Sequence, residues 1–308
     1  MNNFQKSIGC VLVSVVCLCL SVLVYNYNYV NLFAYANDSN SSFWVKSGLL
    51  SDIQKQVFIM VNGEKFSKKD KRGWSLLMYA IASGEKAKAT QLILNGADVN
   101  ARSVAGVTPL MLALRSDAKR IVKLLILKGA DVNAKDNAQR SVLIKEILSG
   151  NQDVEMIRLL ILKGADVNAK DVYGMTPLLF AVDLGSRDIA EALISNGADL
   201  NAQENISGKT SLIVAAYLGH RDIVELLLSK KADIDVKEIH GRTALMNAVF
   251  SGNIEIVKTL ILKGADVKLK DNDGRDALAW AKNFKDEGVK YKKIIKIIEN
   301  TLVKVGRK

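Results

Sequence analysis

The sequence predicts an all-α repeat solenoid. A five-residue string, Gly-Ala-Asp-Val-Asn or a variant of it, recurs along most of the chain. It begins at Gly63 in a weak form and then at Gly96, Gly129, Gly164, Gly197, Lys231 and Gly264. The steps between these seven anchors are 33, 33, 35, 33, 34 and 33 residues. Each step carries the signals of two helices, and such a regular period is typical of a solenoid built from one supersecondary unit.

The first helix of each unit is predicted from its N-cap. Twelve residues after most anchors stands a Ser or Thr, whose side-chain oxygen can accept a hydrogen bond from an unpaired N–H at a helix start. The predicted caps are Ser75, Thr108, Ser141, Thr176, Thr210, Thr243 and finally Asp276. The two prolines of the chain, Pro109 and Pro177, each follow a cap directly, where a missing N–H does no harm.

The second helix is predicted from apolar residues at relative positions 1, 2, 5 and 6, as in Ile121, Val122, Leu125 and Ile126. This spacing lines one helical face, which a neighbouring unit has to cover. The anchor glycine then ends the helix in the left-handed conformation. Lys231 takes that place in one unit, where a side chain carries a conformational cost.

These units resemble the ankyrin repeat. The residues that carry the resemblance are Gly-Val-Thr-Pro-Leu-Met-Leu-Ala at 106–113 and Gly-His-Arg-Asp-Ile-Val-Glu-Leu-Leu at 219–227, together with the Gly-Ala-Asp-Val-Asn strings. The resemblance covers about residue 43 to the C-terminus. It implies stacked helix-turn-helix units with β-hairpin tips projecting from one side, and a concave surface that binds other proteins.

The third full unit departs from the pattern. Gln139 replaces the glycine of the hairpin tip, Glu146 falls where a small buried Ala is expected, and the spacing expands to 35 residues. We expect a shifted or longer first helix in this unit. Because a buried unpaired carboxylate is costly, we also expect Glu146 to reach solvent.

The N-terminus has the order of a secretory signal. Lys6 precedes an apolar run at 8–24, and Ala34-Tyr35-Ala36 provides a small-x-small cleavage site, so residues 1–36 are predicted to be removed. The run of 17 residues is nearly long enough to span a bilayer, and an uncleaved N-terminal membrane anchor remains the alternative. In both cases the remainder is exported, to the periplasm or outside the cell, and the form of the signal favours a bacterial source.

The rest of the chain divides into three parts. We expect an N-terminal capping partial repeat at 37–69, six ankyrin repeats at 70–270, and a C-terminal capping repeat at 271–308. The last 24 residues hold eight Lys or Arg and three Asp or Glu, and Ile294, Ile295, Ile298 and Leu302 share a helical face. This basic amphipathic helix is predicted either to cap the last repeat or to contact an anionic membrane surface.

Composition argues against an enzyme. The three cysteines, Cys10, Cys17 and Cys19, all precede residue 20, and only His220 and His240 are available for acid-base or metal chemistry. His220 matches a structural position of the repeat. The Asp of each anchor string lacks the closely spaced oxygen ligands of a calcium loop, so turn bonding is the better interpretation. We therefore predict no catalytic residue, metal or cofactor. Nucleic-acid binding is not expected despite the net charge of +11, because the chain is exported.

A partner-binding surface is predicted at the hairpin tips and on the exposed face of each first helix. Interfaces are enriched in Tyr, Trp and Arg, whereas a solenoid has little structural need for aromatic residues on a solvent-facing surface. The residues predicted to bind a partner are Trp74, Tyr79, Arg115, Tyr173, Phe180, Tyr217, His240, Arg242 and Phe250.

Two classes of function follow. The first is an exported, monomeric scaffold that binds a polypeptide of unknown identity. The second is a membrane-tethered regulator with an uncleaved anchor and a lipid-contacting C-terminus. An enzyme is the third and weakest hypothesis, because no catalytic group stands out.

Overall fold

The computed structural model describes residues 69–305, which all belong to one of two compact units of the chain, Glu64–Lys308. The predicted signal or anchor and almost all of the predicted N-terminal cap (37–69) lie outside the described residues. Across residues 69–305, no helix combines the length and the apolar character needed to cross a bilayer.

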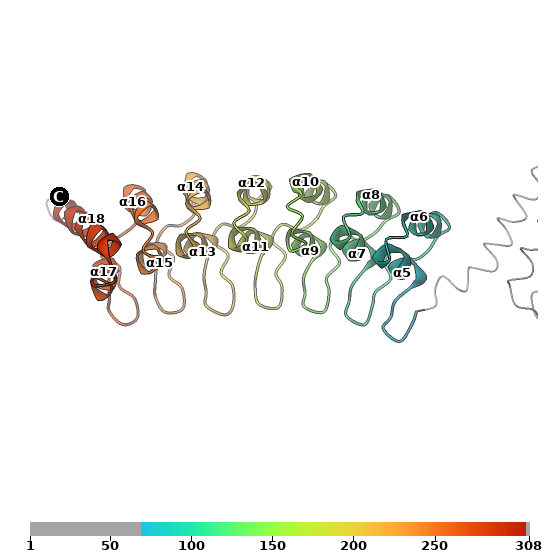
Figure 1. The fold of residues 1–308 in the computed structure, drawn as a ribbon, viewed down its shortest axis with the longest axis horizontal. Helices are drawn as coiled ribbons and strands as arrows, with labels where there is room; N and C mark the ends of the chain where they lie inside the picture. Colours follow the sequence, from blue (N-terminus) through green and yellow to red (C-terminus); the bar gives the residue numbers. More distant parts are fainter. Residues whose placement is uncertain (1–68, 306–308) are drawn as a thin grey trace, which may run out of the picture. The chain divides into compact units, whose positions relative to one another are not determined.

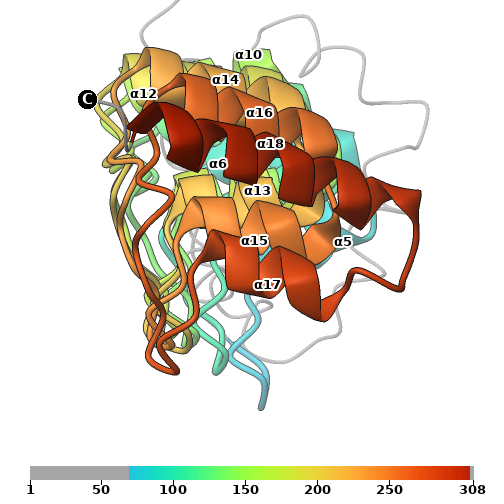
Figure 2. The ribbon, with the colours of Figure 1, turned by 90° about the vertical axis from the view of Figure 1, so that its left-hand side faces the viewer.

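The described residues form seven helix-turn-helix pairs in chain order (Figure 1). The first helices of the pairs, here called the first row, are α5 (Leu76–Ala82), α7 (Pro109–Arg115), α9 (Val142–Ile147), α11 (Pro177–Asp183), α13 (Ser211–Leu218), α15 (Ala244–Ser251) and α17 (Ala277–Asn283). The second row comprises α6 (Lys86–Leu94), α8 (Lys119–Leu127), α10 (Val154–Leu162), α12 (Arg187–Ser195), α14 (Arg221–Ser229), α16 (Ile254–Leu262) and α18 (Val289–Val305). Seen along the stack, the helices of each row lie one behind another in two separate layers, and the hairpin tips gather on one side (Figure 2).

All seven predicted N-caps are confirmed. Each cap residue has an extended backbone, and its side-chain oxygen accepts a hydrogen bond from the backbone N–H three residues later, at 2.8 to 3.4 Å. Pro109 and Pro177 occupy the first helical turn directly after their caps. The local sequence therefore sets where every first-row helix begins.

The core is continuous through the array because each first-row helix packs against the next one. The small residues Ala80, Ala113, Ala181, Ala215 and Ala248 are at most 1% exposed on these helices, which allows the neighbouring helices to approach closely. The second-row helices add the predicted apolar face, with Ile157 and Leu160 of α10 fully buried. Each pair thus depends on its neighbours to keep its apolar surface away from water.

The recurring Gly-Ala-Asp-Val-Asn string links adjacent units. Its Asp bonds the backbone of its own turn, as when Asp131 Oδ1 accepts from the Asn133 N–H at 2.8 Å. Its Asn bridges to the next unit, since Asn133 Oδ1 accepts from the Asp166 N–H and Asn133 Nδ2 donates to the Gly164 carbonyl, both at 2.8 Å. The predicted turn-bonding role of these aspartates is confirmed.

The ends of the second-row helices adopt the predicted left-handed conformation. The anchor glycines have φ between +85° and +96°, and Lys231, which replaces one of them, has φ +67°. A lysine side chain is therefore held in a backbone conformation that only glycine adopts without cost.

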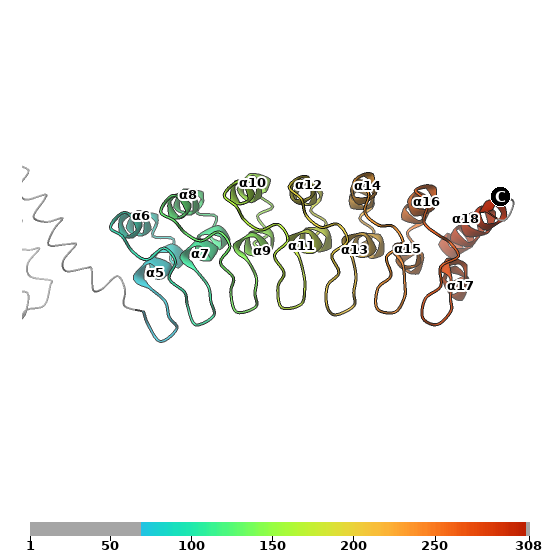
Figure 3. The same cartoon turned by 180° about the vertical axis from the view of Figure 1, so that it is seen from behind.

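The tips of the repeats are hairpin-shaped loops (Figure 3). The resemblance implied β-hairpins, but within residues 69–305 the only β-bridge is an isolated one between Lys135 and Ser141. Adjacent tips are instead joined by single backbone hydrogen bonds, such as Asn137 N–H to the Ala105 carbonyl at 3.0 Å and Ile239 N–H to the Ser207 carbonyl at 2.9 Å. The array is therefore all-α with loop tips that follow one another in register.

The third pair corrects two expectations from the sequence. Its first helix, α9, has six residues and is shorter than the other first-row helices, not longer. The two extra residues lie in the loop between α9 and α10, where Gln152 has φ +48°. Gln139, in place of the tip glycine, also keeps a left-handed backbone, with φ +57°.

Glu146 is the second correction, because it is buried at 4% exposure and does not reach solvent. Its Oε2 atom has no hydrogen-bond partner among the described residues. Burial, together with the nearby carboxylates of Asp153 and Asp117, raises the pKa of Glu146 to about 7, and Lys119 only partly opposes this shift. The sequence argument failed because it treated the carboxyl as permanently charged. With a raised pKa the carboxyl can be protonated, and a neutral carboxyl costs less free energy to bury.

Helix α18 covers the end of the array. Tyr291, Ile294 and Ile298 are at most 3% exposed, and α18 packs against both α16 and α17. The apolar face that the sequence predicted is therefore occupied by contacts with the last repeat, and the lysines of α18 remain on the outside.

The left-handed lysine gives a first prediction. The substitution Lys231→Gly should raise the free energy of unfolding by up to about 1 kcal/mol, because glycine adopts this backbone without a Cβ clash. Urea denaturation followed by circular dichroism measures the change. Lys230→Gly is the matched control, since Lys230 has φ −91° and should gain nothing from glycine. A lower stability of Lys231→Gly than of wild type would contradict the interpretation.

The buried carboxyl gives a second prediction. Because the folded pKa of Glu146 lies above its unfolded value of about 4.3, wild type loses stability as the pH rises from about 4.5 through 7. Glu146→Gln should remove this loss, so that its advantage grows to about 2 to 3 kcal/mol at pH 8 and is small at pH 4.5. Denaturation across this pH range tests the effect.

Glu155→Gln is the control for that experiment, because the Glu155 side chain on α10 is 90% exposed. It should show no such pH dependence. An equal response of the two variants would show that the burial of Glu146 is not the cause.

Candidate partner-binding surface

The first-row helices and the hairpin tips form one continuous face of the array, because each tip leads directly into a first-row helix (Figure 1). The side chains exposed here come from the tips and from the helix positions that no neighbouring helix covers. The predicted partner-binding residues lie on these elements, and the structure separates them into two aromatic clusters and several single positions.

The C-terminal aromatic cluster consists of Tyr217, Phe250, Trp280, Phe284 and Tyr291. Consecutive ring centroids lie 5.2 to 6.3 Å apart, in stacked and edge-to-face arrangements. The rings come from α13, α15, α17, the end of α17 and α18, so the cluster crosses the last three pairs. Tyr217 and Phe250 are 41% and 37% exposed, whereas Trp280 and Tyr291 are buried. The Phe250 ring therefore rests on the buried Trp280 ring, and the Tyr217 ring stacks on Phe250.

The N-terminal aromatic cluster consists of Trp74 and Tyr79, with ring centroids 5.1 Å apart. The Arg72 guanidinium lies 5.4 and 5.7 Å from the two ring centroids, and Arg72 also pairs with Asp70. The hydrogen bond from the Tyr79 hydroxyl, followed by the Trp74 backbone N–H, lowers the pKa of Asp70 to about 2. Trp74 and Tyr79 thus shape the first described tip as well as exposing part of their rings.

A buried acidic residue stands at the base of most tips, and sequence reasoning missed this set. The residues are Asp136, Asp171, Glu204, Glu238 and Asp271, each at most 8% exposed. Their carboxylates accept backbone N–H groups of the tip, as Asp171 Oδ1 does from Tyr173 and Met175 at 2.9 and 3.0 Å. A signal was present, because an acidic residue stands five places before the N-cap in most units.

Asp271 adds side-chain donors from its own tip and from α17 to these bonds. Its carboxylate accepts from the backbone N–H of Arg275 at 2.8 Å, from Arg275 Nε at 3.0 Å and from the Trp280 indole at 2.9 Å. Burial alone would raise the pKa of Asp271, but the hydrogen bonds from Arg275 and Trp280 outweigh it and hold the pKa below its usual value. One tip, one helix and the aromatic cluster are thereby fixed to each other.

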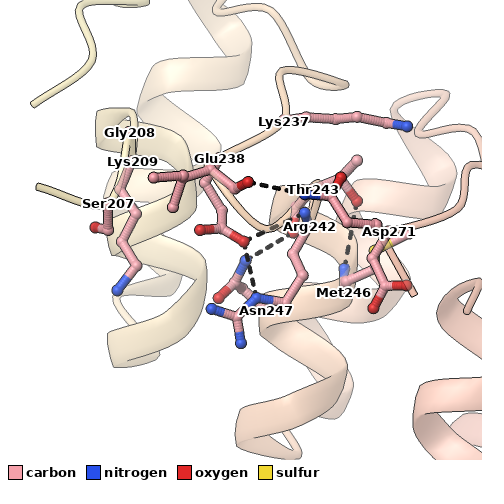
Figure 4. Close-up of polar contacts among 12 residues, drawn as sticks. Ser207, Gly208, Lys209, Lys237, Glu238, Arg242, Thr243, Met246, Asn247 and Asp271 are labelled. Atoms are coloured by element: carbon pink, nitrogen blue, oxygen red, sulfur yellow. Dashed lines mark hydrogen bonds and ion pairs between the residues drawn. The ribbon is translucent and has the colours of Figure 1, made fainter. Parts of the chain in front are cut away.

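Glu238 has the same role in the preceding tip (Figure 4). Its Oε1 accepts from Arg242 Nε at 2.9 Å, and this ion pair, together with the hydrogen bonds to the tip, lowers the pKa of Glu238 against the opposing effect of burial. The Arg242 side chain is 23% exposed. Arg242 was predicted as a partner-binding residue, and the structure pairs its Nε with Glu238 inside the array.

The other predicted residues occupy single positions. Tyr173 and His240 are exposed at two tips, Arg115 is exposed at the end of α7, and Phe180 of α11 is half-buried against the core. His220 is the N-cap residue of α14, and its ring lies against Gly185 in the neighbouring unit, as expected for a structural role. The structure thus brings Tyr217 together with Phe250, and Trp74 with Tyr79. The predicted tip residues lie apart from one another, each on its own loop.

The polar chemistry of this face consists mainly of cations beside aromatic rings. Within residues 69–305 no group of three or more His, Cys, Asp or Glu side chains is arranged to hold a metal ion. Cations lie close to the rings instead, with Lys209 Nζ 5.2 Å from the Tyr217 centroid and the Arg275 guanidinium 4.4 Å from that of Trp280. Aromatic faces with adjacent cations suit contacts with another polypeptide.

Helix pairs in register, left-handed helix ends and loop tips on one side define a helical repeat array. The family description "Ankyrin repeats (3 copies)" matches residues 45–136, 144–238 and 212–296, which is most of the chain. The protein belongs to the ankyrin repeat family.

A solved structure supports the same fold. The chain is similar to the ankyrin repeat domain of Bcl-3, described as a unique member of the IkappaB protein family, with 25% sequence identity and a TM-score of 0.65. The similarity covers 74% of this chain and 100% of that one. Comparison with curated proteins gave no match.

The tip carboxylates give a third prediction. Asp271→Asn should lower the free energy of unfolding by about 1 to 3 kcal/mol at pH 7, because it removes the charge that Arg275 and the Trp280 indole bind. Since the folded pKa of Asp271 is depressed, its contribution is present above about pH 4 and is lost as the pH falls through the folded pKa. Urea denaturation at several pH values, with tryptophan fluorescence as the signal, measures both effects.

Asp273→Asn serves as the control on the same tip. Asp273 also contacts Arg275, but its side chain is 70% exposed, so its removal should change stability by less than about 0.5 kcal/mol. Similar losses in the two variants would show that burial of the Asp271 carboxylate does not matter.

Proposed function

We propose that the protein is a non-enzymatic scaffold that binds a polypeptide through the first-row helices and hairpin tips. Ankyrin repeats are protein-interaction modules, and the family match supports a protein-binding role. The observation that carries the finer proposal is the C-terminal aromatic cluster, in which the exposed ring of Tyr217 stacks on Phe250 and Phe250 lies against the buried Trp280.

A rigid aromatic surface favours binding because little side-chain entropy is lost when a partner docks. Phe250 contacts three other rings, and the Tyr291 hydroxyl donates to the Phe250 carbonyl at 3.0 Å. Tyr217 lies at the open edge of the cluster, next to Lys209. A partner segment with an apolar side chain over Tyr217 and an acidic group near Lys209 would match this edge.

The tips would add the second part of the surface. Tyr173 is 50% exposed, and His240 is exposed two units further along. The buried tip carboxylates keep these loops in one conformation before a partner arrives. The proposed contact area therefore extends from the aromatic cluster along the tips.

For localisation we propose export, on the basis of the signal-like sequence at 1–36. The alternative is a membrane-tethered regulator that keeps residues 8–24 as an anchor. In that alternative the basic C-terminus was expected to contact lipid, but the apolar face of α18 is occupied by α16 and α17. Lipid contact by α18 would have to rely on its lysines and on the exposed Val289 and Val303 near its two ends.

The fourth prediction tests the binding surface. The exported protein is crosslinked in the cell envelope and its bound polypeptide is identified, and affinity is then measured for Tyr173→Ser combined with Tyr217→Ser. The double variant should bind at least about thirtyfold more weakly, because exposed interface tyrosines commonly contribute about 1 kcal/mol or more each. The mass of the same sample gives its first residue, which should be Asn37.

The control variant is Leu127→Ser combined with Leu162→Ser, which removes exposed apolar side chains from the second row and should leave the affinity for this partner unchanged. Equal loss in the two double variants, or no loss in the tyrosine variant, would reject the first-row surface. Retention of residues 8–24 would support the tethered form instead of the cleaved one.

A further inference from the structure

The last residue of each second-row helix forms a column along the array. In α6, α8 and α10 this residue is Leu94, Leu127 and Leu162, with 58%, 79% and 80% of the side chain exposed. We call these three the leucine row. In α12 and α14 the same place is taken by Ser195 and Ser229, and in α16 it is again a leucine, Leu262, at 84% exposure. The fold therefore does not need an apolar side chain here, and the leucines serve no purpose in core packing.

The charged residues next to this position also differ between the helices that end in leucine and those that end in serine. In α8 and α10 the residue one turn before the leucine is Lys123 or Arg158, and the residue after it is Lys128 or Lys163. In α12 and α14 the residue one turn before the serine is an acid, Glu191 or Glu225, each paired with an arginine of its own helix. In α8 and α10 the exposed leucine thus has a cation one turn before it and another directly after it, whereas the serine of α12 and α14 has a carboxylate one turn before it.

The cations beside the leucine row are available for contacts. Among the described residues no carboxylate lies within ion-pair distance of Lys123, Lys128 or Lys163, and Arg158 has only a long contact to Glu155 at 3.9 Å. Arg120 and Lys86 add exposed positive charge on α8 and α6. Helices α8 and α10 therefore each present an exposed leucine flanked by cations.

We propose that the leucine row and its flanking cations bind an anionic lipid surface. The leucines protrude from helix ends with about four-fifths of the side chain of Leu127 and Leu162 free, and such protruding side chains can enter the boundary between headgroups and acyl chains. Lysine stems beside them can reach back to the lipid phosphates. A protein partner of the helix-in-groove kind would instead need a recessed apolar surface.

This surface is separate from the proposed partner site. The second-row helices lie on the side of the first row that is opposite the hairpin tips (Figure 1). A lipid surface at α6, α8 and α10 therefore leaves the tips and the aromatic cluster free to hold a polypeptide. The array would present its partner-binding face away from the membrane.

The test is a lysine footprint on the full chain, so that binding by other segments does not hide the local effect. The protein is acetylated with and without vesicles of phosphatidylcholine containing about 30% phosphatidylglycerol, and the modified lysines are quantified by mass spectrometry. Lys123, Lys128 and Lys163 should be protected, whereas Lys230, after Ser229, should not be. Vesicles of phosphatidylcholine alone should give at least about tenfold weaker protection.

The key variant is Leu127→Ser combined with Leu162→Ser, which copies the residue that the array itself uses at this position. It should raise the lipid concentration needed for half-protection by at least about tenfold. The matched control is Leu184→Ser, directly after α11, combined with Leu218→Ser, at the end of α13; the two leucines are 45% and 42% exposed. The control should bind like wild type, and thermal unfolding confirms that each variant is folded.

The proposal is overturned if these lysines stay accessible at saturating lipid, if neutral vesicles protect them equally, or if the two double variants behave alike. Protection of the same lysines by a purified acidic polypeptide, with none from anionic vesicles, would also overturn it in favour of a protein partner. Because the readout is local to α8 and α10, its failure leaves the first-row partner surface unaffected.

Discussion

The packing of each helix pair against the next is the interaction on which the rest of the array depends. A single pair has an apolar face that it cannot bury by itself, and helices as short as α9 are marginal in isolation. Neighbouring pairs cover this face, small alanines let the first-row helices approach, and the Asn of each anchor string joins the turn of the next unit. Each pair is therefore stabilised by its contacts with the adjacent pairs, and α18 covers the apolar face of the last one.

This architecture leaves the tips and the exposed helix faces free to vary. The buried tip carboxylates explain how loops without strands keep a fixed form, since each carboxylate accepts several N–H groups of its own tip. At Asp271 the same carboxylate also holds Arg275 and the Trp280 indole, which connects the last tip to the aromatic cluster. The surface available to a partner is thus built from internal polar contacts as much as from exposed rings.

The third pair departs most from the regular repeat. The insertion lengthens the loop after α9, and Glu146 carries a carboxyl into the interior beside Asp117 and Asp153. Proton uptake eases this burial at low pH, and Lys119 offers partial compensation through its pair with Asp153 at 2.7 Å. In a nearest-neighbour array such a defect acts on the junctions beside it, while distant units keep their own contacts.

The sequence by itself determined the repeat, the place of every N-cap, the left-handed helix ends and the turn-bonding aspartates. These features depend on local backbone chemistry that a few adjacent residues specify. The aromatic residues of the candidate surface could also be picked out from the sequence. Which of them are exposed could not, because interfaces and cores use the same residue types.

Only the tertiary structure decided which side chains are covered, because coverage depends on the neighbouring unit about 33 residues away. It buried Glu146, paired Arg242 with Glu238, stacked Tyr217 on Phe250, and turned the apolar face of α18 toward α16 and α17. It also left Leu127 and Leu162 uncovered at helix ends. Burial depends on how the repeats stack, so it could not be predicted from the sequence pattern of a single unit.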